Sequence, residues 1–135
     1  MNEEELRHLL GSGDRRSIGN VGGIVPRIKS SPSLVNALVR LMCDADPVVS
    51  MRAADALEKA SRDDPHILAP HKRELLGTIG KNPQQEVRWH LLQILPRLRL
   101  TRAEQTQAFE IATLSLRHHS RIVVADALSA MFKLS

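Results

Sequence analysis

Four histidines are the first residues whose type suggests chemistry, because imidazole nitrogens bind metals. His66 and His71 are five residues apart, and His118 and His119 are adjacent. Helical zinc ligands are typically four residues apart, which puts both side chains on one face of the helix. Neither pair has this spacing, so the sequence predicts no metal site. We interpret these histidines as solvated, with His118 and His119 favourably placed near a helix C-terminus.

A glycine-rich segment, GSGDRRSIGNVGG from Gly11 to Gly23, is the next candidate, because such loops can cradle phosphates. It contains neither a complete GxGxxG nor a GxxxxGK[ST] pattern, so we interpret it as a helix stop followed by closely packed helices. Serines stand mainly at predicted helix starts and carboxylates on solvated faces, so no nucleophile and base come together. The sequence predicts no catalytic residue and no cofactor.

Basic residues are concentrated in the second half of the chain. The net charge is +4, and from residue 65 onward there are ten Lys/Arg against five Asp/Glu. Lys59, Arg97 and Lys133 each stand ten residues after a valine of a repeated pattern described below. They could form a ridge that binds phosphates or acidic peptides. The interpretation we favour is that they complement helix C-termini, as cations ordinarily do.

The composition indicates an all-α fold. There is no Tyr, two Phe and one Trp, whereas strands usually rely on aromatic and β-branched residues. A chain of 135 residues can bury a core as one domain, 1–135. The single cysteine, Cys43 within LVRLMC, is predicted to be a buried small hydrophobe. The acidic start and the lack of an apolar run of about 18 residues lead us to expect a cytoplasmic protein that does not enter the membrane.

Prolines and capping residues divide the chain into helices. Four residues of the types that cap helices stand directly before a proline: Ser31, Asp46, Asp64 and Asn82. A capping-box pattern begins at Thr101, and Ser120 resembles a further cap. Helices are predicted near 32–43, 47–62, 65–81, 83–98, 102–118 and 121–134. Short links make successive helices antiparallel. Pro70 should kink or delay the third of these helices, and Pro96 should bend the fourth.

Two weaker helical segments come before these. A short one ends at Gly11. The segment 14–29 follows, with Ile18, Val21, Val25 and Ile28 on one face.

A repeated pattern links the second helix of each pair. Counting from Val49, Val87 and Val123, the same five offsets are small or apolar in all three helices. The spacings are 87 − 49 = 38 and 123 − 87 = 36. The identical tetrapeptide ADAL at 54–57 and 125–128 has a different spacing, 125 − 54 = 71 against 74 for the apolar pattern. We expect the apolar pattern to set the register, because each unit must bury its face against its neighbours.

The segments DPVVSMRAADAL, PQQEVRWHLLQIL and SRIVVADALSAM resemble the second helices of HEAT repeats, of the short bacterial type. The resemblance implies an armadillo-like α-solenoid of antiparallel helix pairs, with repeats at 31–63, 64–99 and 100–135 and a divergent N-terminal cap at 1–30. In the cap, Gly22 and Gly23 would align with small alanines and let helices approach closely. The arginine that often follows the valine is present only as Arg88, with Ser50 and Val124 at the equivalent positions.

The resemblance also implies a binding site, because these second helices line the concave surface of HEAT solenoids. The residues expected there are Met51, Arg52, Asp55, Trp89, His90, Gln93, Asp126 and Ser129. Trp89 could be an exposed anchor for a peptide or a base, or it could pack against a neighbouring helix. HEAT-like DNA glycosylases pair concave tryptophans with an acid and an arginine, but the residue one turn after Trp89 is Gln93. We therefore expect no enzyme.

The function expected from the sequence is that of a non-enzymatic scaffold that binds a peptide or protein on the concave face. The alternative is nucleic-acid binding through the basic C-terminal half, which would make the affinity strongly salt-dependent. The few aromatic residues weigh against stacking of single-stranded bases. The apolar C-terminal helix, VVADALSAMFKLS, makes a homodimer through that end a further expectation.

Overall fold

The computed structural model describes residues 1–11 and 18–135, and side chains for residues 1–11 and 23–135. Every regular element in these ranges is helical, which confirms the all-α prediction. The α-helices are α1 (Glu3–Gly11), α2 (Ile18–Lys29), α3 (Pro32–Leu41), α4 (Pro47–Ser61), α5 (Lys72–Leu76), α6 (Gln85–Ile94), α7 (Arg102–Ser115) and α8 (Arg121–Leu134). Three 3-10 turns, η2 (Pro65–His71), η3 (Ile79–Lys81) and η4 (Leu95–Arg97), lie between them.

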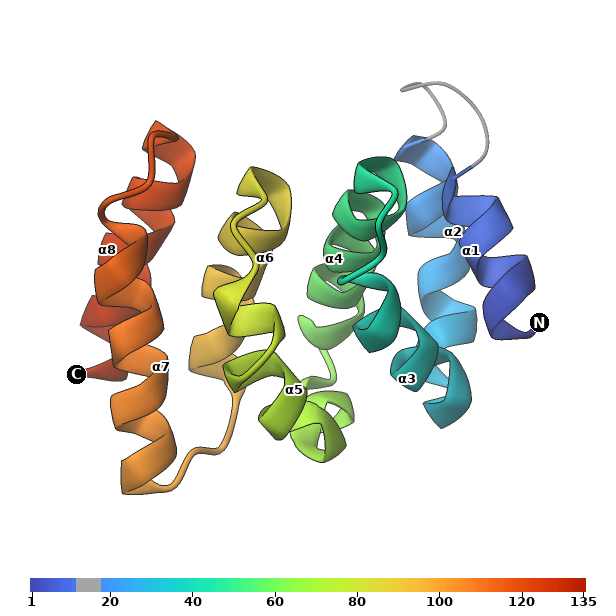
Figure 1. Ribbon diagram of the computed structural model, residues 1–135. Helices are drawn as coiled ribbons and strands as arrows, with labels where there is room; N and C mark the ends of the chain where they lie inside the picture. The colour runs from blue at the N-terminus through green and yellow to red at the C-terminus, as the bar shows by residue number, and fades with distance from the viewer. Residues whose placement is uncertain (12–17) are drawn as a thin grey trace.

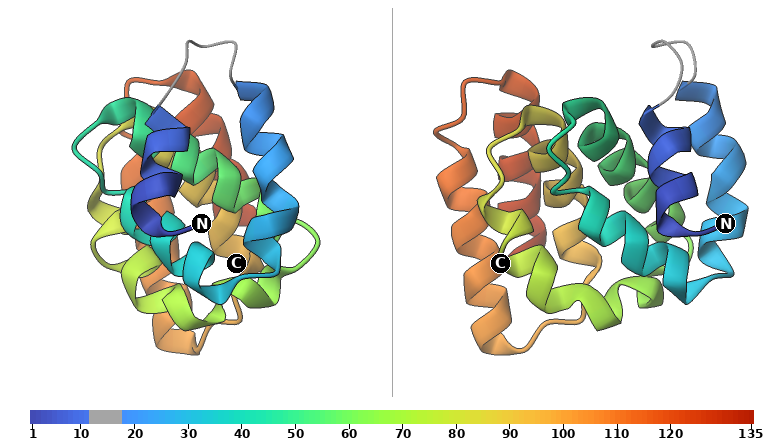
Figure 2. Two further views of the ribbon diagram at one scale, coloured as in Figure 1. Left: turned by 90° about the vertical axis from the view of Figure 1, so that its right-hand side faces the viewer. Right: turned by 45° about the vertical axis from the view of Figure 1, so that its right-hand side comes forward.

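The helices form a solenoid of two layers (Figures 1 and 2). In one layer α2 packs on α4, α4 on α6 and α6 on α8. The other layer contains α1, α3, α5 and α7, and pairs such as α3 with α4 and α7 with α8 join the two layers. The two ends of the chain lie at opposite ends of the stack (Figure 1). This arrangement leaves one side of the α2–α4–α6–α8 layer free of the other layer.

Four of the predicted helix caps are present. Ser31, Asp46 and Ser120 each accept a hydrogen bond from a first-turn amide, and Thr101 with Glu104 forms a complete capping box. Asp64 is different, because its side chain makes no cap hydrogen bond and instead pairs with Lys29 at 3.1 Å.

The start of α6 also differs from the prediction. Asn82 Oδ1 accepts from the Gln84 amide at 2.9 Å, but the helix begins at Gln85 rather than at Pro83. The side chain of Asn82 therefore shapes the turn before the helix.

The predicted helix 65–81 is wrong as a single element. It is divided into η2, α5 and η3. Pro70 lies inside η2, where it removes an amide donor and prevents a continuous α-helix, so α5 begins only at Lys72. Gly77 ends α5, at a position where a Cβ would lie 2.8 Å from the Arg73 carbonyl oxygen. Pro96 likewise lies in η4, which continues α6.

The burial pattern shows which register the last helix uses. Val49, Val87 and Val123 are all buried, at 1%, 0% and 0% exposure. In the apolar register Ala53, Leu91 and Ala127 are equivalent, and all three are 0% exposed, whereas in the ADAL register Ala53 would match Val124, which is only partly buried. The apolar pattern therefore sets the register, as predicted.

The prediction for Cys43 is wrong, because its side chain is exposed. Leu41 and Met42 take the core positions at the end of α3, and Cys43 follows in the turn, where its amide bonds to the Arg40 carbonyl. Partial burial raises the pKa of the Cys43 thiol. An apolar neighbourhood in the sequence did not carry over into the fold, since the helix ended two residues earlier.

The N-terminal predictions are partly outside the described residues. These include 12–17 of the glycine-rich segment and the side chains of Ile18, Val21 and Gly22. Ile28 is buried and Val25 half-buried, as the predicted face requires. The expectation of close packing is wrong at Gly23, since nothing lies within 4 Å of the position that a Cβ would take. Close packing occurs instead at Gly11, where an added Cβ would lie 3.1 Å from Val49 Cγ2.

Candidate partner-binding surface

Three parallel stripes of side chains cross the α4–α6–α8 layer, one on each helix. In each stripe the residues are four apart, so those within α4, α6 and α8 lie on one face of their helix, while Arg97 follows α6 in η4. All nine are at least partly exposed in a layer that otherwise supplies much of the core. We call this the stripe surface, and it consists of Met51, Asp55 and Lys59, then Trp89, Gln93 and Arg97, then Ala125, Ser129 and Lys133.

Two polar contacts at equivalent positions each join a stripe residue to the neighbouring helix. Asp55 Oδ1 lies 3.5 Å from Nε2 of His90, and Gln93 Nε2 donates to Asp126 Oδ2 at 3.4 Å. The spacings, 93 − 55 = 38 and 126 − 90 = 36, equal those of the repeat. Each polar contact therefore occupies the same place between consecutive helices, and it keeps the stripes in register.

A groove of about 370 Å³ lies between α6 and α8. It brings together five of the predicted residues, three from the partner-binding set and two from the basic set. The residues that line it are Leu92, Gln93, Pro96, Arg97, Asp126, Ser129, Ala130 and Lys133. The exposed lining of the groove is mainly polar, with an amide, a carboxylate, a hydroxyl and two cations, which suits hydrogen bonding to a polar chain.

Two of the three cations on the stripe surface have acidic partners. Lys59 Nζ lies 3.1 Å from Asp55, and Arg97 lies 2.9 Å from Glu58. Among the described residues no acid lies close enough to Lys133 for an ion pair, although its charge lowers the pKa of Asp126 across the groove. The position equivalent to Glu58 for Lys133 is 58 + 38 = 96, which is Pro96. The free cationic charge of the groove therefore lies at its α8 side.

Burial and neighbouring groups shift the pKa values of Asp126 and Asp55 in opposite directions. Burial raises the pKa of Asp126, and the hydrogen bond from Gln93 offsets only part of that effect. Burial also tends to raise the pKa of Asp55, but hydrogen bonds from His90 and Lys59 bring it below its ordinary value. Of these two carboxylates, Asp126 therefore binds a proton more readily.

Three predicted site residues are partly or wholly covered. Arg52 is 4% exposed and donates to the Leu10 carbonyl at 2.7 Å, which connects α4 with α1. His90 is 7% exposed, and its Nδ1 lies 2.6 Å from the Glu86 carbonyl. Trp89 packs against the core and against the His90 ring, with centroids 4.9 Å apart, and remains partly exposed. Of these three, only Trp89 presents surface to a partner.

Two polar residues that follow the repeat valines connect neighbouring helices, which the sequence did not establish. Arg88 is 8% exposed and donates to the Gly80 carbonyl at 2.7 Å and to Ser115 Oγ at 3.1 Å. Burial lowers the pKa of its guanidinium. Ser50, at the equivalent position in α4, donates to Gln84 Oε1 at 2.6 Å. Ser50 therefore connects α4 with the start of α6, and Arg88, at the equivalent position of α6, connects α6 with α7.

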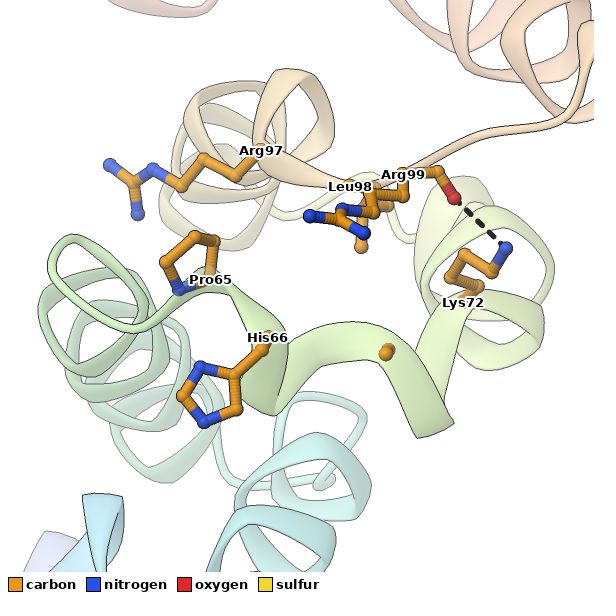
Figure 3. A pocket seen from close by; sticks show the side chains of 7 residues that line it. Pro65, His66, Lys72, Arg97, Leu98 and Arg99 are labelled. Atoms are coloured by element: carbon orange, nitrogen blue, oxygen red, sulfur yellow. Dashed lines mark hydrogen bonds between the residues drawn. The ribbon is translucent and has the colours of Figure 1, made fainter.

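A second groove, of about 500 Å³, is the other place where cations gather (Figure 3). Its lining includes His66, Lys72, Arg97 and Arg99. Lys72 turns to the Arg99 carbonyl at 3.0 Å and pairs with Glu104 at 2.9 Å. Since Lys72 and Arg97 each pair with an acid, Arg99 is the arginine or lysine of this groove without an acidic partner among the described residues.

Two kinds of feature are absent from the described residues. No helix among them is long and apolar enough to cross a membrane. No cluster of three or more His, Cys, Asp or Glu side chains in the same ranges has the geometry of a metal site.

Comparison with known proteins places the chain in a family. No curated protein and no solved structure matched it. Residues 9–118 match the model of the HEAT repeat domain, which is most of the 135-residue chain. HEAT repeats form helical-repeat scaffolds that typically mediate protein interactions, and the family is generally non-enzymatic. The two stacked layers, the periodic valines and this match agree, and the chain belongs to the HEAT repeat family.

Proposed function

We propose that this protein is a non-enzymatic scaffold that binds an extended segment of another protein along the stripe surface, with the α6–α8 groove as the main contact. On this proposal the chain is one domain, with repeats at 31–63, 64–99 and 100–135 and a cap at 1–30. The observation that carries the proposal is the convergence of Gln93, Asp126, Ser129 and Lys133 on one groove.

The groove favours a peptide with an acidic side chain. Lys133 supplies a cation whose acidic neighbour in the groove, Asp126, is attracted to it without a close ion pair among the described residues, while Gln93 and Ser129 supply donors and acceptors for a peptide backbone. Trp89 lies one helical turn before Gln93 on the same stripe and adds an apolar contact. An extended acidic segment satisfies all three features at once.

The test is selection of peptides from a displayed random library on the immobilised protein, followed by affinity measurement with the peptides recovered. Lys133→Glu should weaken the selected peptides at least about tenfold, because a charge contact becomes a repulsion. Arg102→Glu, on exposed α7, makes the same charge change away from the groove and should leave the affinity unchanged. Trp89→Ala should also abolish capture without loss of helical circular dichroism.

Selected peptides that bind Lys133→Glu as tightly as the unmodified protein would rule out the groove. Selection that recovers no acidic consensus would rule out the proposed peptide class. In either case the binding surface must lie elsewhere on the solenoid.

A further inference from the structure

Arg88 carries a buried charge that no acid among the described residues neutralises. The side chain is 8% exposed, and all the acceptors of its hydrogen bonds are neutral: the Gly80 and Asn82 carbonyls, at 2.7 and 2.9 Å, and Ser115 Oγ, at 3.1 Å. Burial lowers the pKa of the guanidinium, and no carboxylate offsets that effect. A buried charge ordinarily has an opposite charge beside it, because desolvation makes an uncompensated charge costly. Arg88 therefore lacks the negative partner that a buried guanidinium usually has.

The connection between helices does not by itself require this charge. Ser50 holds the equivalent position in α4, and its neutral hydroxyl makes the connection to Gln84 there. In Arg88 the hydrogen bonds come from Nε and Nη1, whereas Nη2 donates none within the described ranges and is not sealed from solvent. The two N–H groups of Nη2 are therefore available to a ligand.

Arg88 lines a groove of about 410 Å³, formed by the segment before α6 and the end of α7, whose other ionised residues are basic. We call it the η3–α7 groove. Its Lys81 and Arg117 are exposed, and neither forms an ion pair with another described residue. Glu86 and Glu110, the acids closest in sequence to the lining residues, do not line the groove. The lining therefore holds three positive charges and no negative one.

His118 and Leu114 complete the η3–α7 groove. His118 Nδ1 accepts from the Ser120 amide at 3.0 Å, so the ring proton is on Nε2, which donates to the Pro83 carbonyl at 3.1 Å. The ring is therefore neutral and held in place through both nitrogens. Leu114 is 59% exposed and gives the groove an apolar side. A ligand with an anionic group next to an apolar group matches this lining.

This groove is separate from the α6–α8 groove. It lies beside the start of α6 and the turn between α7 and α8, whereas the α6–α8 groove lies toward the C-terminal ends of α6 and α8 (Figure 1). The two grooves share no lining residue. A ligand in the η3–α7 groove is therefore independent of the peptide proposed for the stripe surface.

We infer that the η3–α7 groove binds a phosphomonoester dianion, with Arg88, Lys81 and Arg117 donating to its oxygens. A carboxylate or a nucleic-acid phosphodiester carries one negative charge, whereas a phosphomonoester carries about two near neutral pH and offers three acceptor oxygens. The planar fork of a guanidinium also matches the geometry of a phosphate. The phosphomonoester could belong to a phosphorylated side chain of another protein or to a small phosphorylated molecule, and the exposed Leu114 suits the first of these.

Titration of the whole ¹⁵N-labelled protein with inorganic phosphate, replacing chloride at constant ionic strength, tests the site at about pH 7.5, where the dianion predominates. Saturable shifts should appear at the Lys81 and Arg117 amides and at Arg88 Nε–H. Arg117→Gln should weaken binding at least about fivefold, because a charge-assisted contact is lost. Arg99→Gln is the matched control, since Arg99 is also exposed without an acidic partner among the described residues but lines the other cationic groove; its affinity should not change.

Shifts that do not saturate, or equal effects of the two glutamine variants, would overturn the inference. Lys81→Gln should repeat the effect of Arg117→Gln. Arg88→Lys keeps the charge but loses the planar fork, and it should weaken phosphate binding while helical circular dichroism is retained. If Arg88→Lys unfolds the protein, the variants of the two exposed cations still decide.

Short peptides with leucine beside phosphoserine, glutamate or serine distinguish the sources of the phosphate. Tighter binding of the phosphoserine peptide than of inorganic phosphate, by about tenfold, would identify a phosphorylated protein, because leucine adds an apolar contact with Leu114. Equal affinities of these two would identify a small phosphorylated molecule, and either result supports the site. A glutamate peptide that binds as tightly as the phosphoserine peptide, or duplex DNA that displaces phosphate from the same amides at lower concentration, would contradict the inference.

Discussion

Arg97, in the turn that follows α6, reaches back to α4 and bonds Glu58 twice, through the carboxylate at 2.9 Å and through the main-chain oxygen at 2.7 Å. It also donates to Ser61 Oγ at 2.8 Å. Glu58 is 3% exposed and accepts two further hydrogen bonds from Arg62, both at 2.8 Å. Arg97, which the sequence suggested as a ligand for anions, therefore connects α4 with the turn after α6.

Removing the charge of Glu58 should destabilise the protein. Glu58→Gln leaves Arg97 partly buried without its carboxylate, and we expect the free energy of unfolding to fall by about 2 kcal/mol. Asp63→Asn is the control, because Asp63 is exposed and lies 3.5 Å from Lys29; its cost should stay below about 0.5 kcal/mol. Urea unfolding followed by circular dichroism measures both. Equal effects of the two variants would show that the Glu58 cluster contributes little.

Acid should weaken the fold through the same carboxylate. Burial tends to raise the pKa of Glu58, but hydrogen bonds from Arg62 and Arg97 hold it below its ordinary 4.5. The unfolded chain then binds a proton at higher pH than the folded one, so this contribution is complete above pH 4.5 and is lost as the pH falls through the folded pKa. The stability difference between the unmodified protein and Glu58→Gln should shrink below pH 4.5. A difference that stays constant to pH 3 would contradict this assignment.

Two glycines should respond oppositely to alanine. At Gly80 a Cβ would lie 2.7 Å from Ile111 Cδ1 and 3.3 Å from the Leu75 carbonyl, so Gly80→Ala should cost about 1–3 kcal/mol through overpacking. At Gly23, inside α2, a Cβ meets nothing within 4 Å, so Gly23→Ala should gain up to about 1 kcal/mol from helix propensity. Thermal unfolding of both variants checks the signs. A gain at Gly80 would mean that Ile111 moves aside.

Arg52 should control the stability of the first helix. Its guanidinium is buried and donates to the Leu10 carbonyl at the end of α1, so Arg52→Ala removes a connection between α4 and α1. We expect amide hydrogen exchange in α1 to accelerate by roughly tenfold or more, while exchange in α8, far along the stack, changes little. Mass-spectrometric exchange with peptide resolution provides the measurement. Uniform acceleration along the chain would show a global effect instead.

Nucleic acid should bind weakly. Lys59 and Arg97 are engaged by Asp55 and Glu58, which reduces the positive potential that the basic set would otherwise offer to phosphates. Labelled duplex and single strands should therefore show little binding at physiological salt. Tight binding that falls steeply with salt, and that weakens when Lys59, Arg97 and Lys133 lose their charges, would support the alternative function.

The sequence by itself determined the repeat and the starts of α3, α4, α7 and α8, because these depend on local and periodic signals, whereas α3, α6 and α7 end two to four residues before the predicted positions. Valine spacings of 38 and 36, together with caps such as Asp46 and Thr101, predict helices that the structure contains. The sequence could also place the stripe residues of each helix on one face, since residues four apart lie on the same side of any α-helix. Pro70 predicted a disturbed helix, and the extent of that disturbance was the part that local reasoning missed.

Tertiary structure alone decided which of these side chains are exposed to a partner and which are buried or paired within the protein. Arg52 and Lys133 are both basic residues on second helices, yet the first is buried against Leu10 and the second is exposed. Leu92 and Leu128 likewise hold equivalent positions of the repeat, yet the first is 1% exposed and the second 55% exposed. Burial and charge pairing arise from residues about 30 to 40 positions apart, and periodicity specifies the faces of a helix without specifying what covers them.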